Sequence, residues 1–264
     1  MKTNNLEKLR EKNPLVLNIT NIVVSNYVAN GLLSIGSSPI MSNAIEEMDE
    51  LPAICQALVI NIGTLTSAQI EAMIKAGKSA NKNNTPVVLD PVGVAATTFR
   101  QETVKTLLNE IKFDLIRGNA GEIAYLAQVN WNAKGVDAGS GEGDLAKIAK
   151  DVALKYDCIV SISGETDYIS DGVKVAKIEN GTELFPKITG SGCLLSAVCG
   201  AFLTLDGDVF DLTVNACTSY AIVGELAGEN LRDHQIGQFY INLLDSLALV
   251  DDEITEKYAK VSFE

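Results

Sequence analysis

The chain alternates short, wholly apolar segments with longer segments whose apolar residues recur every three or four positions. Leu15–Ile19, Ala57–Ile62 and Pro86–Asp90 read as strands, whereas Val23–Ile35 and Thr66–Ala80 read as helices. A strand that is apolar at every position needs helices over both of its faces. The alternation therefore predicts an α/β fold, with a mostly parallel central sheet, right-handed crossovers and helices on both faces.

The rest of the chain extends this pattern. Further strands are expected at Pro39–Met41, Phe113–Ile116 and Asp157–Ile162, and a hairpin at Tyr168–Val175 that turns at Asp171-Gly172. The chain from Ser191 to Leu249 is expected to be nearly all helical, and the Gly-, Asp- and Ser-rich segment Asn130–Gly143 to be an exposed loop. The sequence contains no internal repeat and no clear linker, so residues 1–264 are expected to form a single domain.

Composition narrows the class of protein. The formal net charge of −13 argues against nucleic acid and anionic membranes as partners. Five cysteines, no Cys-x-x-Cys pair and one histidine argue against a disulfide framework or a zinc site, and suit the cytoplasm. The start of the chain is polar and has no apolar h-region, so a secretory signal is not expected, and no apolar stretch is long enough to cross a bilayer.

The segment Thr189-Gly190-Ser191-Gly192-Cys193 leads into an apolar helix. Unpaired amides and the helix dipole at such a start bind anions, usually phosphate. Cys193 lies in the first turn, where a helix N-terminus lowers the pKa of a thiol, so its sulfur is expected to accept a proton. Gly190, Gly192 and Cys193 thus form a candidate catalytic segment for phosphoryl transfer to a hydroxyl, although such a turn can also serve only packing, and a small cysteine only the core.

Ligands of an open parallel sheet bind beyond the carboxyl ends of its strands. Asp90 ends one apolar strand, and a charge buried there needs a partner, for which Mg²⁺ or its water is suitable. Asn119 and Glu122 follow the next strand, where they can order Mg²⁺ and its waters against a triphosphate. Asp90 can equally be a turn residue, and Asn119 and Glu122 can form a helix capping box.

Two further groups can meet phosphate at this edge. Arg117 can neutralise charge on a transferring phosphoryl group. Ser163 and Gly164 end the strand expected at Asp157–Ile162 and can touch a nucleotide phosphate through a hydroxyl and an amide, or can simply form a turn.

Several segments agree in order, spacing and content with one known family, and the sequence resembles the hydroxyethylthiazole kinases, members of the ribokinase-like superfamily that serve thiamine salvage. The matching segments are Asn18–Asn21, Val23–Asn26, Ala29-Asn30, Ser38–Met41, Asn61–Leu65, Leu89–Gly93, Arg117–Asn119, Gly135–Asp137 and Thr189–Cys193. The superfamily usually has aspartate as the base where this chain has Cys193, and cysteine at that place marks the thiazole kinases.

The resemblance implies a ribokinase-like three-layer sandwich that phosphorylates 4-methyl-5-(2-hydroxyethyl)thiazole with ATP and Mg²⁺. Asp90 and Glu122 would engage Mg²⁺, and Arg117, Asn119, Ser163 and Gly164 would contact ATP. The family pattern places Asn21, Val23, Met41, Gly63 and Gly190 at or near the thiazole. It also implies a homotrimer whose active sites are shared between neighbouring subunits.

Three alternatives remain from the sequence. One is another small-alcohol kinase of the superfamily, acting on hydroxymethylpyrimidine or pyridoxal, against which Cys193 and Ser38–Met41 argue. Another is an ATP-dependent hydratase of damaged nicotinamide cofactor, which would need no hydroxyl acceptor. The third is a nucleotide-binding regulator without catalysis, which the retained Asp90, Arg117, Asn119 and Glu122 disfavour.

Overall fold

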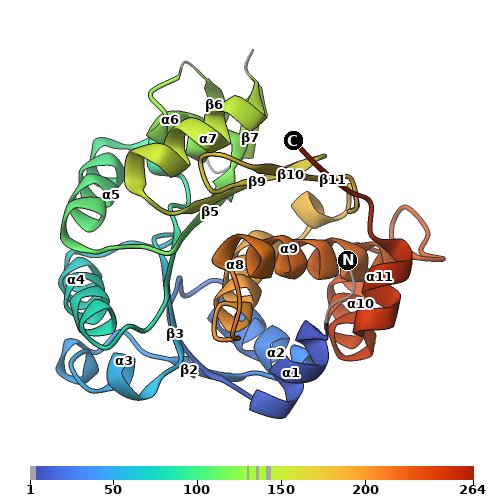
Figure 1. The fold of residues 1–264 in the computed structure, drawn as a ribbon, viewed down its shortest axis with the longest axis horizontal. Coiled ribbons are helices and arrows are strands. Elements are labelled where there is room, and N and C mark those ends of the chain that lie inside the picture. Colours follow the sequence, from blue (N-terminus) through green and yellow to red (C-terminus); the bar gives the residue numbers. More distant parts are fainter. Residues whose placement is uncertain (1–3, 130, 135–136, 141–143) are drawn as a thin grey trace.

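A nine-stranded sheet organises the computed structural model, which describes residues 4–129, 131–134, 137–140 and 144–264 (Figure 1). The strand order is β11-β10-β9-β8-β5-β4-β3-β1-β2. The six strands from β2 to β8 in this order are parallel, and β9, β10 and β11 are added antiparallel at one edge. This arrangement confirms the expected mostly parallel sheet.

The strands of this sheet are β1 (Leu15–Ile19), β2 (Ser38–Met41), β3 (Ala57–Asn61), β4 (Val87–Asp90), β5 (Leu115–Asn119), β8 (Ile159–Ser163), β9 (Asp167–Ser170), β10 (Val175–Ile178) and β11 (Val261–Phe263). The helices are α1 (Asn5–Lys12), α2 (Ser25–Ile35), α3 (Leu51–Ile54), α4 (Ser67–Lys82), α5 (Thr98–Glu110), α6 (Ala120–Leu126), α7 (Leu145–Tyr156), α8 (Ser191–Phe202), α9 (Val209–Gly228), α10 (Ile236–Leu249) and α11 (Asp252–Tyr258). Short 3-10 turns lie at Ile45–Glu47, Val94–Ala96 and Phe185–Lys187.

Each face of the sheet has its own apolar core. Alternate strand residues such as Val16, Val59 and Val88 pack with α2, α8, α9 and α10 on one side. Their neighbours Leu58 and Leu89 pack with α4, α5, α6 and α7 on the other. Figure 1 shows the two helical layers on either side of the sheet, with α8 close to its centre. Coverage of both faces explains why the strands are apolar at every position.

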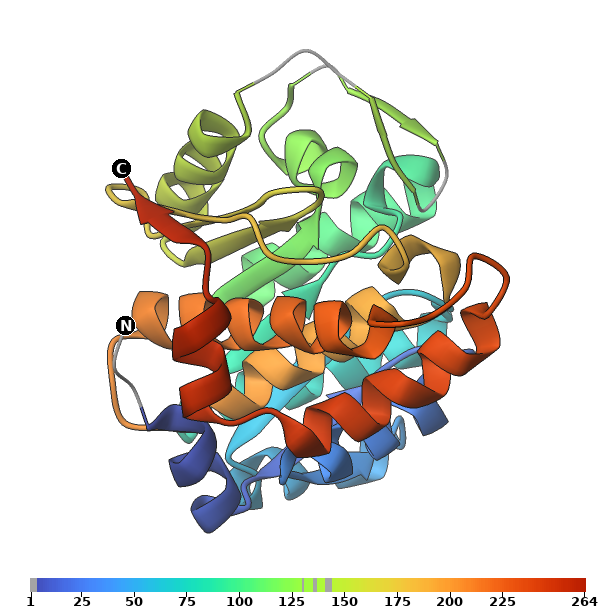
Figure 2. The same ribbon diagram turned by 90° about the vertical axis from the view of Figure 1, so that its right-hand side faces the viewer.

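Most expected elements occur within two residues of their expected ends. Thr66 proves to be the N-cap of α4, in a capping box with Gln69. Asp171 and Gly172 lie between β9 and β10, as expected for the hairpin. In Figure 2, the C-terminal strand β11 lies beside this hairpin and extends the sheet, a pairing that the sequence analysis did not anticipate.

The expectation of a loop at Asn130–Gly143 was wrong in its described part. Two short strands, β6 (Asn132–Lys134) and β7 (Asp137–Ser140), pair antiparallel there. Backbone hydrogen bonds between the two segments outweigh their turn-forming composition. Residues 130, 135–136 and 141–143 lie outside the described part of the chain, and with them most of the family-like segment 135–137. No helix in the described ranges has the length and apolar character needed to span a bilayer.

Candidate active site

Polar residues from five elements meet at the carboxyl edge of the parallel strands. Asn61 of β3 is in register with Asp90 of β4, and Asn119 of β5 with Ser163 of β8. The N-terminus of α8 lies over the same edge, because Ser196 of α8 hydrogen-bonds to Asp90. The structure thus brings together the phosphate, metal and catalytic candidates that the sequence placed at strand ends.

The start of α8 has the form of an anion cradle. Gly190 is its N-cap with φ of 98°, a left-handed conformation that favours glycine. The first helical bond runs from the Leu194 amide to the Gly190 carbonyl at 2.8 Å. The amides of Ser191, Gly192 and Cys193 have no hydrogen-bond partner among the described residues. They can therefore donate to a phosphoryl oxygen.

Asp90 is the most deeply buried carboxylate of the site, at 1% exposure. Its Oδ2 accepts hydrogen bonds from Asn61 Nδ2 at 2.8 Å and from Ser196 Oγ at 2.9 Å. Its Oδ1 is buried without any partner among the described residues. Burial raises the pKa of Asp90, although Arg117 and the two hydrogen bonds favour the ionised form. An unpaired buried oxygen of this kind is suited to a cation or its water.

Glu122 serves the local fold as well as the site. It forms the capping box of α6 with Asn119, which confirms the capping interpretation. Glu122 Oε2 accepts from the Asn119 amide at 2.8 Å, and its Oε1 accepts from the Gly93 amide at 2.7 Å. Burial and the charge of Asp90 raise the pKa of Glu122 to about 7. The side chain is thereby held close to Asp90, where it can support a bound cation.

Arg117 is the positive centre of the site and is only 7% exposed. Burial alone would lower its pKa, but the carboxylates of Asp90, Glu122 and Asp167 raise it. Its Nη2 donates to the hydroxyl of Ser163, while its buried Nε has no partner among the described residues. The guanidinium therefore keeps donor capacity for a phosphate.

Gly164 is brought to the same edge, but its amide is already engaged. It donates to Asp167 Oδ1 at 2.9 Å, so the expected contact of this amide with phosphate would have to replace that bond. Burial raises the pKa of Asp167 to about 6, against the Gly164 bond and the charge of Arg117.

The expected lowering of the Cys193 pKa was wrong. Burial, with the charge of Asp90, raises the pKa of the Cys193 thiol to about 12, against favourable contacts with Asn61, Arg117 and Asn21. Desolvation of the thiolate outweighs the helix dipole here. Cys193 is therefore a protonated thiol near neutral pH, at hydrogen-bond distance (3.5 Å) from Asn21 Nδ2.

The residues expected to bind the thiazole differ in how closely they lie to the site. Asn21 lies against Gly63, since a Cβ on Gly63 would come within 2.6 Å of Asn21 Nδ2. Met41 is partly buried at the carboxyl end of β2. Val23, by contrast, is 66% exposed, and its neighbour Val24 is the residue that packs against Gly190.

The residues present fit Mg²⁺ delivered with a nucleotide. The described part of the chain has no group of three or more His, Cys, Asp or Glu side chains arranged to hold a metal alone. Mg²⁺ typically takes one or two carboxylates, with phosphate oxygens and waters completing its shell. Oδ1 of Asp90, to which no described residue donates, meets that requirement with Glu122 nearby.

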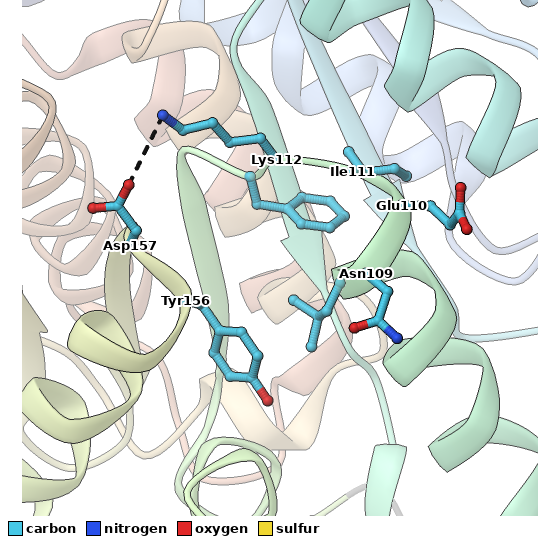
Figure 3. Close-up of a pocket in the computed structure, with 8 residues that line it drawn as sticks. Asn109, Glu110, Ile111, Lys112, Tyr156 and Asp157 are labelled. Carbon is cyan, nitrogen blue, oxygen red and sulfur yellow. Dashed lines mark ion pairs between the residues drawn. The ribbon is translucent and has the colours of Figure 1, made fainter.

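A surface hollow lies at the opposite edge of the sheet (Figure 3). It is lined by the end of α5 and the segments that precede β5 and β8, including Phe113 and Tyr156. Lys112 and Asp157 form an exposed ion pair across it at 4.0 Å. It lies at the amino ends of these strands and has no part in the site.

Two site residues, Asp167 and Ser196, were not singled out from the sequence, and Asn61 was recognised only as part of the segment Asn61–Leu65, without a role of its own. Asn61 had a signal, because it is a polar residue at the end of an apolar strand. Asp167 follows Ser163-Gly164 closely, but only the structure shows that it faces Arg117. Ser196 had none, since a serine inside an apolar helix is ordinary, and its contact with Asp90 depends on how α8 packs.

Comparison with known proteins shows which family the chain belongs to. The model of the hydroxyethylthiazole kinase family matches residues 6–253. A hydroxyethylthiazole kinase of Pasteurella multocida is 61% identical over 98% of both chains, and one of Haemophilus influenzae is 56% identical over 97% of both. The structure of the hydroxyethylthiazole kinase protein from Pyrococcus horikoshii superposes with a TM-score of 0.89 at 37% identity, covering 98% of this chain and 97% of that one.

A more distant likeness concerns the fold alone. The pyridoxal kinase of Staphylococcus aureus in complex with ADP superposes with a TM-score of 0.63 at 13% identity, covering 95% of this chain and 98% of that one. The three-layer arrangement is therefore ribokinase-like, as the resemblance implied. Taken with the full-length matches, the strand-end carboxylates and the glycine-rich cradle place this chain in the hydroxyethylthiazole kinase family.

Proposed function

We propose that this protein transfers the γ-phosphoryl group of ATP to the hydroxyl of 4-methyl-5-(2-hydroxyethyl)thiazole, in thiamine salvage. The observation that carries the proposal is the meeting of three helix-start amides with Arg117 and Oδ1 of Asp90, where neither the amides nor this oxygen has a partner in the described part of the chain. Membership of the family supplies the substrate. The continuous nine-stranded sheet supports treating residues 1–264 as one kinase domain.

On the nucleotide side, the cradle and Arg117 would stabilise negative charge. Phosphoryl transfer has a loose transition state, so positioning and charge neutralisation supply most of the rate. The amides of Gly192 and Cys193 would donate to the transferring group, and Arg117, with Asn119, Ser163 and Gly164, would contact ATP phosphates. Asp90 and Glu122 would hold Mg²⁺, partly through water; bound there, the ion would neutralise charge on the phosphates.

On the acceptor side, a small neutral ring needs an apolar pocket with few polar anchors. Asn21, Val23, Met41, Gly63 and Gly190 form the proposed thiazole site. Cys193 would orient the hydroxyl, and weak deprotonation is all that its raised pKa allows. Met41 supplies a thioether that packs well on a polarizable ring.

A homotrimer with shared sites, in the cytoplasm, completes the proposal. Two large apolar side chains beside Asn21 support a shared site, because Ile22 is 76% and Val23 66% exposed. Coverage by a neighbouring subunit would remove this surface from water and would bring Val23 into use. Five free cysteines suit a reducing compartment. The molar mass, measured by light scattering after size-exclusion chromatography, tests whether the protein is a trimer.

Mg²⁺-dependent release of ADP with four acceptors tests the function: the hydroxyethylthiazole, hydroxymethylpyrimidine, pyridoxal and ribose. Turnover on the thiazole alone is expected. Turnover on another acceptor would reassign the substrate, and ADP release with none would favour a hydratase. Tight binding of ATP without turnover would indicate a regulator.

A further inference from the structure

The side chain of Asn61 makes three hydrogen bonds while only 2% exposed. Its Oδ1 accepts from the Gly63 amide at 2.9 Å and from Asn21 Nδ2 at 3.0 Å, and its Nδ2 donates to Asp90 Oδ2 at 2.8 Å. A backbone amide can only donate, so Gly63 fixes which end of the Asn61 amide is oxygen. The donor end must then face Asp90.

This orientation determines which oxygen of Asp90 is available. Asn61 and Ser196 both donate to Oδ2, which leaves Oδ1 without a partner among the described residues. Two hydrogen bonds thereby fix Asp90 Oδ2 in place, and Oδ1 stays available to a bound cation. Ser196 makes no hydrogen bond to Asn21 or Gly63. Its one other acceptor among the residues with described positions is the Gly192 carbonyl of α8, at 3.4 Å.

The other end of the Asn61 side chain, Oδ1, contacts the residues assigned to the alcohol substrate. Asn21 donates to Asn61 Oδ1 at 3.0 Å and lies 3.5 Å from Cys193 Sγ through the same nitrogen. Gly63 packs so closely on Asn21 that a Cβ would come within 2.6 Å of its Nδ2. One amide therefore contacts both Asp90 and the two residues assigned to the thiazole.

We infer that Asn61 is a positioning residue that sets the register between the metal-facing carboxylate of Asp90 and the alcohol-binding residues Asn21 and Gly63. The inference rests on the proposed function, which assigns those two sides. In-line transfer needs the hydroxyl and the phosphoryl group in a fixed relation, and a misplacement of 1 Å can cost about 100-fold in rate.

Three variants separate the two ends of this contact. Asn61→Leu removes all three hydrogen bonds at similar volume. Asn61→Asp keeps both acceptor bonds and loses the donor to Asp90. Ser196→Ala removes the bond to Asp90 Oδ2 and the longer bond to the Gly192 carbonyl, and it leaves the bonds of Asn21 and Gly63 to Asn61 in place. Asn18→Leu is the matched control, because Asn18 is 1% exposed on the neighbouring strand and in register with Val59. Within the ranges that the structure describes, its side chain donates only to the Val16 carbonyl.

Two binding measurements accompany kcat. Calorimetry gives the affinity for hydroxyethylthiazole without nucleotide, and electron paramagnetic resonance gives the affinity for Mn²⁺ with a non-hydrolysable ATP analogue. We expect Asn61→Leu to weaken both by about tenfold or more, as for loss of hydrogen bonds to buried polar groups, and to lower kcat by roughly 100-fold. We expect Ser196→Ala to weaken Mn²⁺ binding alone.

Asn61→Asp is expected to keep thiazole affinity and to lose kcat, and it carries the test if Asn61→Leu does not fold. The inference is overturned if Asn61→Leu changes both affinities no more than Asn18→Leu does, or if Asn61→Asp keeps the wild-type kcat. If the wild-type protein does not phosphorylate the thiazole, the proposed function fails instead, whatever the variants do.

Discussion

Gly192 lies directly against the guanidinium of Arg117: a Cβ at Gly192 would come within 2.8 Å of Arg117 Nη1. Glycine is therefore needed at position 192 to leave space for the Arg117 side chain, and not because the backbone bends there. The amides at the start of α8 and the guanidinium can then act on the same phosphoryl group, which is the arrangement that charge neutralisation requires.

Gly192→Ala should displace Arg117, which is held in place by Ser163. We expect kcat to fall by about 10- to 100-fold, the cost of misaligned charge stabilisation, with little change in melting temperature. Steady-state kinetics at saturating thiazole, with a thermal melt of the same sample, check this. Wild-type kcat in Gly192→Ala would mean that Arg117 does not act on the phosphoryl group.

Gly190→Ala should lose both stability and activity. Gly190 has φ of 98°, and a Cβ there would come within 2.8 Å of Val24 Cγ1. Gly181→Ala is a matched control, since Gly181 has φ of 135° but a Cβ there would meet nothing within 4 Å. Both variants carry backbone strain of about 1–2 kcal/mol, but only Gly190→Ala should lose most of kcat/KM. Gly190→Val, with more bulk, should abolish activity. Equal kinetics for the two alanine variants would remove Gly190 from the site.

Cys193→Asp should keep activity. A protonated thiol of pKa about 12 orients the acceptor more than it deprotonates it, and the superfamily's aspartate can do both. Cys193→Ala should cost about tenfold, less than the 10²–10⁴ of a full general base. The pH profile of wild-type kcat should show no inflection near pH 8.5, the ordinary pKa of a thiol. A folded but inactive Cys193→Asp variant would contradict the role of Cys193 in orienting the hydroxyl.

The ligand-free protein should lose stability as pH rises through the titration of Asp167. Burial raises the pKa of Asp167 from 3.8 to about 6, so the folded state binds more protons than the unfolded state between these values. The free energy of unfolding should therefore fall by roughly 1–3 kcal/mol from pH 4 to 6 on account of this group.

Asp167→Asn isolates that contribution, because its Oδ1 can still accept from the Gly164 amide. Urea unfolding should give similar stabilities for variant and wild type near pH 4, and a more stable variant near pH 8. Parallel curves for the two proteins across this range would contradict the assignment.

The sequence predicted the sheet and the edge where the site lies, because a polar residue that ends an apolar strand, such as Asp90, can be recognised locally. The chemistry of Cys193 was not predictable in this way. Its pKa depends on how deeply α8 and the strand ends bury the thiol, which is a tertiary property. Ser196 was not predicted for the same reason, since its contact with Asp90 depends on the packing of α8. The strands β6 and β7 were not predicted because their pairing outweighs a turn-like composition.

Transfer of a radiolabelled γ-phosphate from ATP to hydroxyethylthiazole, across a Mg²⁺ titration, tests the central claim most directly. The wild-type protein should label the thiazole only with Mg²⁺. Asp90→Asn, which alters the buried carboxylate that Asn61 and Ser196 hold, should slow labelling by at least about 100-fold. Labelling without Mg²⁺, labelling by Asp90→Asn at the wild-type rate, or no labelled thiazole from the wild-type protein would contradict the account.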